Sequence, residues 1–194
     1  NRRYDPNFIK IKKSYKEKPK LIIFRYSKGL FNYGSHFIDF VIDWYGKIVK
    51  VKSIDINNKK IIKKKDPQLS FSMITKNNIK IKCISTEQTD YDQFEIDLFF
   101  KKFVLSIKNG GNDIFLAKSV KNLYFLGYNQ LDDTKKIYNS RVGNLLPLYE
   151  MLIEGVKNNK AINCCEIKDA LYGMKVLDAV VESNNQSNKT IEIK

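Results

Sequence analysis

The sequence predicts an α+β fold: a large, mostly antiparallel sheet with helices packed on one face. Helical patterns stand near both ends of the chain, while residues 48 to about 138 form short alternating runs typical of strands. Asn- and Gly-rich pairs separate these runs, as hairpin turns would. The order helix, strand, helix, sheet, two helices, strand is therefore α+β and not alternating βαβ. With 194 residues, 43% of them hydrophobic, we expect residues 1–194 to form one domain.

The first elements are a helix and a strand. Asp5 is a good N-cap and Pro6 suits the first helical position, which predicts a helix to about Tyr15, closed off by Pro19. The following run, 20–27, is rich in β-branched and aromatic residues and predicts a strand with a buried centre.

The segment Phe31 to Gly46 predicts a helix that is apolar on two sides and ends at the glycine. A helix with so much apolar surface must pack between other elements. The two stripes are Phe37, Val41 and Trp44, and Ile38, Ile42 and Tyr45.

The middle of the chain predicts an antiparallel meander. Aromatic residues at four positions indicate that its second face is not fully solvated, and such a face is typical of an oligomer interface. The predicted strands are Ile48–Ile56, Leu69–Thr75, Ile79–Ser85, Gln93–Phe99, Phe103–Lys108 and Ile114–Ala117, the turns are Asn57-Asn58, Asn77-Asn78 and 109–112, and the aromatic residues are Phe99, Phe100, Phe103 and Tyr124.

Two amphipathic helices and a short strand are predicted at the end of the chain. The helices are Asn144–Asn158, with a stripe of Leu145, Leu148, Leu152 and Val156, and Glu166–Ser183, with a stripe of Ala170, Met174, Leu177 and Val181; the strand is Thr190–Ile193.

The formal charge of +14 could indicate a partner such as nucleic acid or an anionic membrane. Of the 35 basic residues, however, only Arg2, Arg3, Arg25 and Arg141 are arginines, and the lysines are scattered along the chain. Because arginine makes most bidentate contacts to phosphates and bases, this pattern favours compositional bias, and a basic nucleic-acid module stays the weaker alternative. No stretch approaches the roughly 20 apolar residues of a membrane span, so we expect no membrane partner.

Three cysteines without a CxxC spacing favour reduced thiols in a cytoplasmic protein. With a single histidine in the chain, we expect no metal site. The start at Asn1 has neither an initiator Met nor a signal peptide, so we expect a fragment of a longer protein. There is no GxGxxG, GxxxxGK[ST] or GxSxG motif, so we expect no cofactor on this chain alone.

His36, the sole histidine, is the leading candidate for catalysis. On a helix, Asn32 would lie one turn before it, and Asp39 could hydrogen-bond the imidazole and aim its other nitrogen at a substrate hydroxyl. A buried structural histidine at a helix start is the alternative.

Three motifs in order resemble the Gfo/Idh/MocA family of glucose–fructose oxidoreductase and inositol dehydrogenase. They are Asn-Arg-Arg-Tyr-Asp-Pro-Asn-Phe (1–8), Gly-Ser-His-Phe-Ile-Asp (34–39) leading to Trp-Tyr-Gly (44–46), and Leu-Leu-Pro-Leu-Tyr-Glu-Met-Leu-Ile-Glu-Gly (145–155) followed by the helix 169–183. The resemblance implies the C-terminal domain of a two-domain NAD(P)-dependent oxidoreductase, with no Rossmann domain in this chain. It implies oxidation of a sugar or nucleotide-sugar hydroxyl, homo-oligomers formed through the open sheet face, NAD or NADP bound mainly by the missing domain, and a chain that is inactive alone.

The same resemblance implies roles for individual residues. His36 matches the histidine of the family's Asp-x-x-x-His pair, but Asn32 replaces the aspartate and can only hydrogen-bond. This departure leaves a non-catalytic binding or scaffold protein as the alternative. Tyr33 and Arg141 are further candidates for the substrate pocket, and Arg2 and Arg3 for cofactor contacts; structural roles are the alternative for all four. Glu-Lys-Pro at 17–19 spells the family's catalytic-lysine motif, but it lies in the wrong place for it.

Overall fold

The computed structural model describes residues 2–54, 66–86, 90–139, 145–160, 162 and 165–193. The strands are β1 (Leu21–Tyr26), β2 (Ile48–Ser53), β3 (Phe71–Thr75), β4 (Lys80–Ser85), β5 (Phe94–Phe99), β6 (Phe103–Lys108), β7 (Asp113–Lys121), β8 (Asn129–Leu131), β9 (Lys135–Asn139) and β10 (Ile191–Glu192). The α-helices are α1 (Pro6–Ser14), α2 (Ser35–Tyr45), α3 (Leu146–Lys157) and α4 (Ile167–Asn185), with 3₁₀ turns at Arg2–Tyr4 and Asn109–Gly111 and a π-helical turn at Leu30–Gly34.

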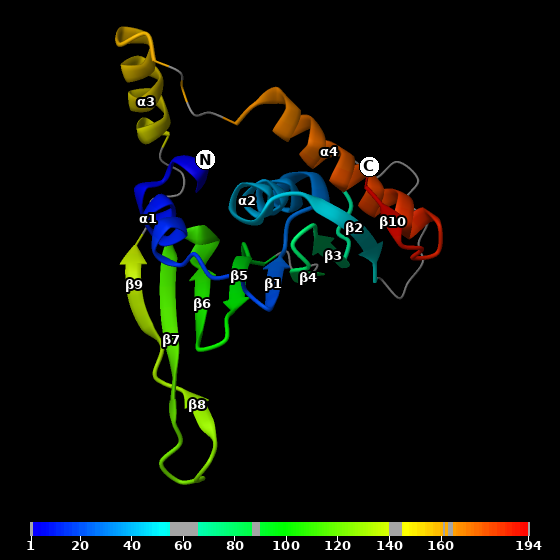
Figure 1. Cartoon of the computed structure of the whole chain (residues 1–194). Coiled ribbons are helices and arrows are strands. Elements are labelled where there is room, and N and C mark those ends of the chain that lie inside the picture. Colours follow the sequence, from blue (N-terminus) through cyan, green and yellow to red (C-terminus); the bar gives the residue numbers. More distant parts are fainter. Residues whose placement is uncertain are drawn as a thin grey trace.

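The strands form one ten-stranded sheet in the order β10-β2-β3-β4-β1-β5-β6-β7-β8, with β9 also paired to β7 (Figure 1). Only the β1–β4 pair is parallel within this order; the other pairs are antiparallel. The predicted α+β class and mostly antiparallel sheet are therefore confirmed. The parallel pair arises because β2, β3 and β4 form a meander that returns beside β1 after α2.

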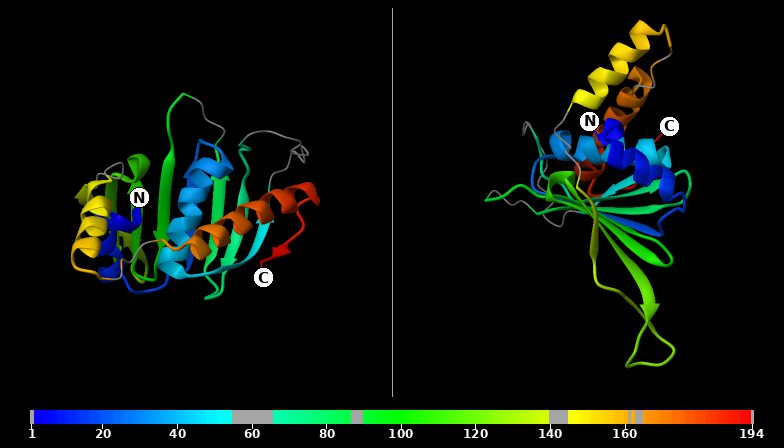
Figure 2. Two further views of the ribbon diagram at one scale, coloured as in Figure 1. Left: turned by 90° about the horizontal axis from the view of Figure 1, so that it is seen from above. Right: turned by 90° about the vertical axis from the view of Figure 1, so that its left-hand side faces the viewer.

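The helices α1, α2 and α4 lie over one face of the sheet, here called the inner face (Figure 2). Alternate side chains of the strands are buried under them, as in β1, where Ile22, Phe24 and Tyr26 are fully buried. The ring of Phe24 stacks on that of Phe37 with centroids 4.2 Å apart. This packing fixes α2 against the centre of the sheet, as its two predicted apolar stripes required.

The ends of the first helices agree with the predicted caps. The Asp5 carboxylate accepts hydrogen bonds from the backbone N–H groups of Asn7 (2.9 Å) and Phe8 (3.1 Å), and Pro6 occupies the first turn of α1. Helix α2 ends at Gly46, whose φ of 86° is unfavourable for residues with a Cβ.

The predicted stripes of the last two helices are wrong in detail. In α4 the buried residues include Val176, Leu177 and Val180, whereas Met174 is 47% exposed, because only the second half of α4 lies over the sheet. Helix α3 stands away from the sheet, so its apolar stripe is only partly covered: Leu148 and Leu152 are partly buried and Leu145 and Val156 are exposed (Figure 1). Val156, for example, is 76% exposed.

The predicted placement of the aromatic residues on the second sheet face is largely wrong. Phe99 alone lies on that outer face, opposite the helices, since it alternates with the buried Leu98. Phe100 and Phe103 stack on each other at the β5–β6 turn, 4.3 Å between centroids. Tyr124 lies at the tip of a long hairpin between β7 and β8 (Figure 1). Periodicity alone could not show that β7 would leave the sheet.

Two predicted features fall outside the described residues: the turn Asn57-Asn58 and the candidate site residue Arg141. No helix in the ranges that the structure describes is long and apolar enough to cross a membrane.

Candidate functional site

The candidate site begins with an unusual helix start. Residues Leu30–Gly34 form one π-helical turn that runs directly into α2, a feature often found at functional sites. The Asp66 carboxylate accepts hydrogen bonds from the backbone N–H groups of Phe31 (2.7 Å) and Asn32 (3.1 Å). Gly29 is needed here because a Cβ at this position would lie 2.0 Å from Asp66 Cγ. A distant carboxylate thus holds the turn that presents the next residues.

His36 lies in the first turn of α2, and its side chain is exposed at the surface. Partial desolvation and the nearby charge of Arg2 lower the pKa of His36, and the charge of Asp39 opposes them. The imidazole is therefore neutral at neutral pH and can accept a proton. The alternative of a buried structural histidine is inconsistent with this exposure.

Asp39 does not orient the imidazole as predicted. Both of its oxygens accept hydrogen bonds from Arg3: 2.9 and 3.0 Å from Nε, and 2.6 Å from Nη2. A guanidinium fits a carboxylate with two parallel hydrogen bonds, and this geometry prevails over a single bond to a ring nitrogen. Asp43 and Asp169 each lie 3.8 Å from Arg3 Nη1, so Arg3 joins the N-terminal turn to α2 and α4.

Arg2 occupies a different environment, close to the site. Its Nη2 donates to the carbonyl oxygen of Gly110 (2.8 Å), and its guanidinium lies 3.7 Å from the centroid of the Phe94 ring. Burial lowers the pKa of Arg2 to about 10, so the group remains charged at neutral pH. Its Nε is buried without a hydrogen-bond partner among the described residues, which leaves a donor available to a ligand.

The structure brings three of the predicted site residues together. The Tyr33 ring packs edge-on against Phe94, 5.3 Å between centroids, on the ring that also carries Arg2. Arg2 in turn acts on the charge state of His36. Asn32 is exposed on the preceding π-helical turn, and its backbone carbonyl oxygen accepts a hydrogen bond from Ser35 Oγ (2.7 Å).

Three contributors were missed by sequence reasoning: Asp66, Phe94 and Gly110. All three lie more than 30 residues from the groups they contact, so only the tertiary structure connects them.

Two hollows flank the N-terminal helices. A groove of about 590 Å³ runs between α1, α2 and α3, and both Arg2 and Arg3 line it together with Lys12, Lys13 and Lys16. Its concentration of cations suits an anionic ligand.

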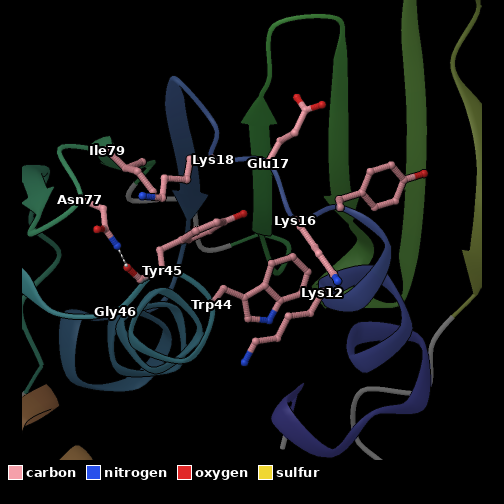
Figure 3. A pocket seen from close by; sticks show the side chains of 10 residues that line it. Lys12, Lys16, Glu17, Lys18, Trp44, Tyr45, Gly46, Asn77 and Ile79 are labelled. Atoms are coloured by element: carbon pink, nitrogen blue, oxygen red, sulfur yellow. Dashed lines mark hydrogen bonds between the residues drawn. The ribbon is translucent and has the colours of Figure 1, made fainter.

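A second pocket of about 410 Å³ lies at the far end of α2 (Figure 3). Trp44 and Tyr45 line it from the helix, and the lysines come from α1 and the segment after it. The Asn77 amide donates to the Tyr45 carbonyl oxygen (3.1 Å) and closes one side. His36 lines neither hollow, so the candidate catalytic residue and the larger groove are linked through Arg2.

Comparison with known proteins finds similarity in the fold but not in the sequence. No family model matches the sequence, and no curated protein matches it. Solved structures do match, at 11–16% identity.

Three of these structures illustrate the likeness. A provisionally assigned NADPH-dependent oxidoreductase from Desulfitobacterium hafniense is 12% identical, with a TM-score of 0.73 over 98% of this chain and 62% of its own. The WlbA dehydrogenase from Bordetella pertussis, solved with NADH and UDP-GlcNAcA, is 11% identical, with a TM-score of 0.64 over 95% of this chain and 57% of its own. A super-repressor mutant of Gal80p from Saccharomyces cerevisiae is 16% identical, with a TM-score of 0.70 over 98% and 63%.

This chain therefore shares its fold with domains of solved oxidoreductases and of Gal80p. More specifically, the chain has the fold of the C-terminal domain of Gfo/Idh/MocA-type oxidoreductases, which confirms the predicted resemblance at the level of structure. It spans about 60% of the length of the solved proteins it matches.

Proposed function

We propose that residues 1–194 form the substrate-binding and oligomerisation domain of an NAD(P)-dependent dehydrogenase that oxidises a sugar or nucleotide-sugar hydroxyl. The observation that carries this proposal is the exposed, neutral imidazole of His36 beside the buried guanidinium of Arg2. The likeness to WlbA, solved with NADH and a UDP-sugar, supports the substrate class.

His36 is the proton acceptor in this proposal. As the substrate C–H bond breaks, the hydroxyl proton passes to the free imidazole nitrogen and the carbon–oxygen double bond forms. The nicotinamide, when bound, supplies the hydride acceptor. Asn32 takes no proton and contributes a hydrogen bond to substrate, so proton transfer depends on His36 and on the lysine expected in the Rossmann domain.

The basic residues around the groove suit the phosphates of a dinucleotide or nucleotide sugar. Arg2 keeps a buried Nε donor without a partner among the described residues, and it lines the groove of about 590 Å³. Arg3 is more strongly engaged by carboxylates, so its contribution to cofactor binding is to hold Arg2 and the N-terminal turn in place. Tyr33, on the turn before His36, is proposed to contact the substrate, and Arg141, outside the described residues, stays a predicted contact.

The test is turnover of the full-length protein on a panel of nucleotide sugars. General acid–base catalysis contributes typically 10²–10⁴-fold, so His36→Ala should lower kcat by about that factor with little change in thermal stability. Lys175→Ala, an exposed change on α4, serves as the matched control. The wild-type rate should fall as pH drops through the His36 pKa, and near-normal turnover by the His36 variant refutes the assigned role.

A non-catalytic binding protein is the second candidate, because Asn32 replaces an acid and the fold also occurs in a protein described as a super-repressor. Nucleotide-sugar binding without turnover by the full-length wild-type protein favours it. In either case we place the protein in the cytoplasm, as a homo-oligomer formed through the outer sheet face.

A further inference from the structure

The hairpin between β7 and β8 presents a large apolar surface to solvent. The side chains at its tip are exposed by 68–92%, a concentration unusual for a protein surface. They are Leu123 84%, Tyr124 86%, Phe125 68%, Leu126 92% and Tyr128 72%. We call residues 118–132 the arm and residues 122–128 its tip.

The tip is a loop ordered by its own hydrogen bonds. The Asn122 side-chain oxygen accepts hydrogen bonds from the backbone N–H groups of Tyr124 and Phe125, each 2.8 Å, and its amide donates to Gln130 Oε1 (2.7 Å). The backbone N–H of Asn122 donates to the Tyr128 carbonyl oxygen (3.0 Å). Gly127 has a φ of 86°, which favours glycine in this turn. A loop ordered before binding loses little entropy when it docks.

The arm leaves the sheet on the side of the outer face. In Figures 1 and 2 the helices lie on one side of the sheet and the arm hangs toward the other. The outer face also carries an apolar row that leads to the base of the arm, since the registers place these residues side by side across four strands. The row is Leu21, Phe99, Val104 and Ala117.

We propose that the arm grips a second copy of this chain, its tip packing on the outer sheet face of the partner. This inference rests on the oligomer of the proposed function and specifies how it is held. In a two-fold pair each arm reaches the other subunit, which gives a self-complementary interface.

The dimensions and the area fit this occupant. The first exposed apolar side chain of the tip, Leu123, is six residues beyond Ala117, a reach of roughly 20 Å, whereas sheets packed face to face lie about 10 Å apart. Aromatic side chains bury about 150–250 Å² each, so three aromatics and two leucines bring roughly 700 Å². A stable interface needs about 800 Å² per partner. The arm brings most of this area, and the partly exposed Leu21, Phe99 and Val104 add to it, whereas Ala117 is already buried.

The charges around the arm favour protein over lipid. Lys118 and Lys121 lie on one strand of the arm, and Lys135 and Lys136 follow the other. Asp132 and Asp133 interrupt these lysines, so the arm has no purely cationic collar for an anionic bilayer. Asp132 also accepts a hydrogen bond from the backbone N–H of Lys118 at the base of the arm.

The first experiment measures self-association of the full-length protein by sedimentation equilibrium. The combined variant Leu123→Ser, Tyr124→Ser, Phe125→Ser and Leu126→Ser should weaken the dimer at least 100-fold while leaving the circular dichroism spectrum and Tm unchanged. Tyr149→Ser with Ile153→Ser is the control, since it removes apolar groups of α3 that are 55% and 53% exposed and should leave the dimer intact.

The second experiment locates the tip with a photo-crosslinking amino acid at position 124, in a mixture of ¹⁴N- and ¹⁵N-labelled protein. Crosslinks between the two isotopes that map to β1, β5 or β6 support the proposal. A dimer that persists in the serine variant, with no such crosslink, overturns the arm but leaves a sheet-face oligomer. A monomeric wild type overturns both, as does a monomer whose tip binds phosphatidylserine vesicles.

Discussion

The two faces of the sheet differ in almost every physical respect. On the inner face Phe24 and Phe94 are fully buried under α2, whereas on the outer face the alternating neighbours Arg25, Glu95 and Asp97 are half-exposed and paired with one another. The inner face carries the stability that holds α2, and so the position of His36. The outer face can change its contacts without disturbing that site, which suits it to a partner.

The sharpest test of this difference compares adjacent residues of β1. Phe24→Ala should lower the free energy of unfolding by about 3–5 kcal/mol, because it leaves a cavity beside Phe37. Ile23→Ala, on the outer face, should cost about 1 kcal/mol or less in the monomer. Urea unfolding at low protein concentration measures both free energies. Equal losses in the two variants would contradict the difference between the inner and outer faces.

A buried hydroxyl on the inner face provides the next test. Tyr26 is fully buried, and its hydroxyl donates to the Leu69 carbonyl oxygen. Tyr26→Phe should cost about 1–3 kcal/mol, because a buried acceptor loses its donor. Tyr91→Phe, at a position 59% exposed, is the control and should change the unfolding midpoint little. A Tyr26→Phe variant as stable as the wild type would show that water reaches this part of the inner face.

On the outer face the test is an ion-pair network. Arg25 Nη2 lies 2.7 Å from Asp97 and 3.2 Å from Glu95. Arg25→Met leaves two adjacent carboxylates and should cost about 1 kcal/mol, since partial exposure weakens the pairing. Adding salt screens the repulsion between the two carboxylates and should reduce the difference in unfolding free energy between the variant and the wild type. A loss that salt does not alter would indicate packing instead of charge.

The smallest expected effect concerns pH at the edge of the outer face. The hydrogen bond from Lys136 (Nζ to Oδ1, 2.8 Å) lowers the pKa of Asp113 below its ordinary value of 3.8. The pair therefore stabilises the native state above pH 3.8, and this contribution is lost as pH falls through the lower native pKa. Asp113→Asn should reduce the dependence of the unfolding free energy on pH in that range. An unchanged pH dependence would show that the ion pair with Lys136 contributes no stability.

Local sequence determined much of this protein. The caps at Asp5 and Gly46, the two-sided helix α2, the alternation of the strands and the turn at 109–111 all follow from short-range chemistry: side-chain hydrogen bonds to backbone, glycine conformations and hydrophobic period. The place of His36 at the start of α2 followed from the same patterns, but its exposure did not, because the spacing left a buried structural histidine open until the structure placed the side chain at the surface.

The tertiary structure decided the rest, because the energies concerned depend on groups distant in the chain. Asp39 accepts hydrogen bonds from Arg3, although His36 is the closer residue along the helix. Asp66 likewise binds the backbone of a π-helical turn more than 30 residues away. Likewise, the apolar run at 123–128 has a sequence pattern compatible with a buried strand. It is an exposed tip because the end of β7 leaves the sheet. Periodicity specifies which side chains share a face, whereas packing between distant segments decides what that face meets.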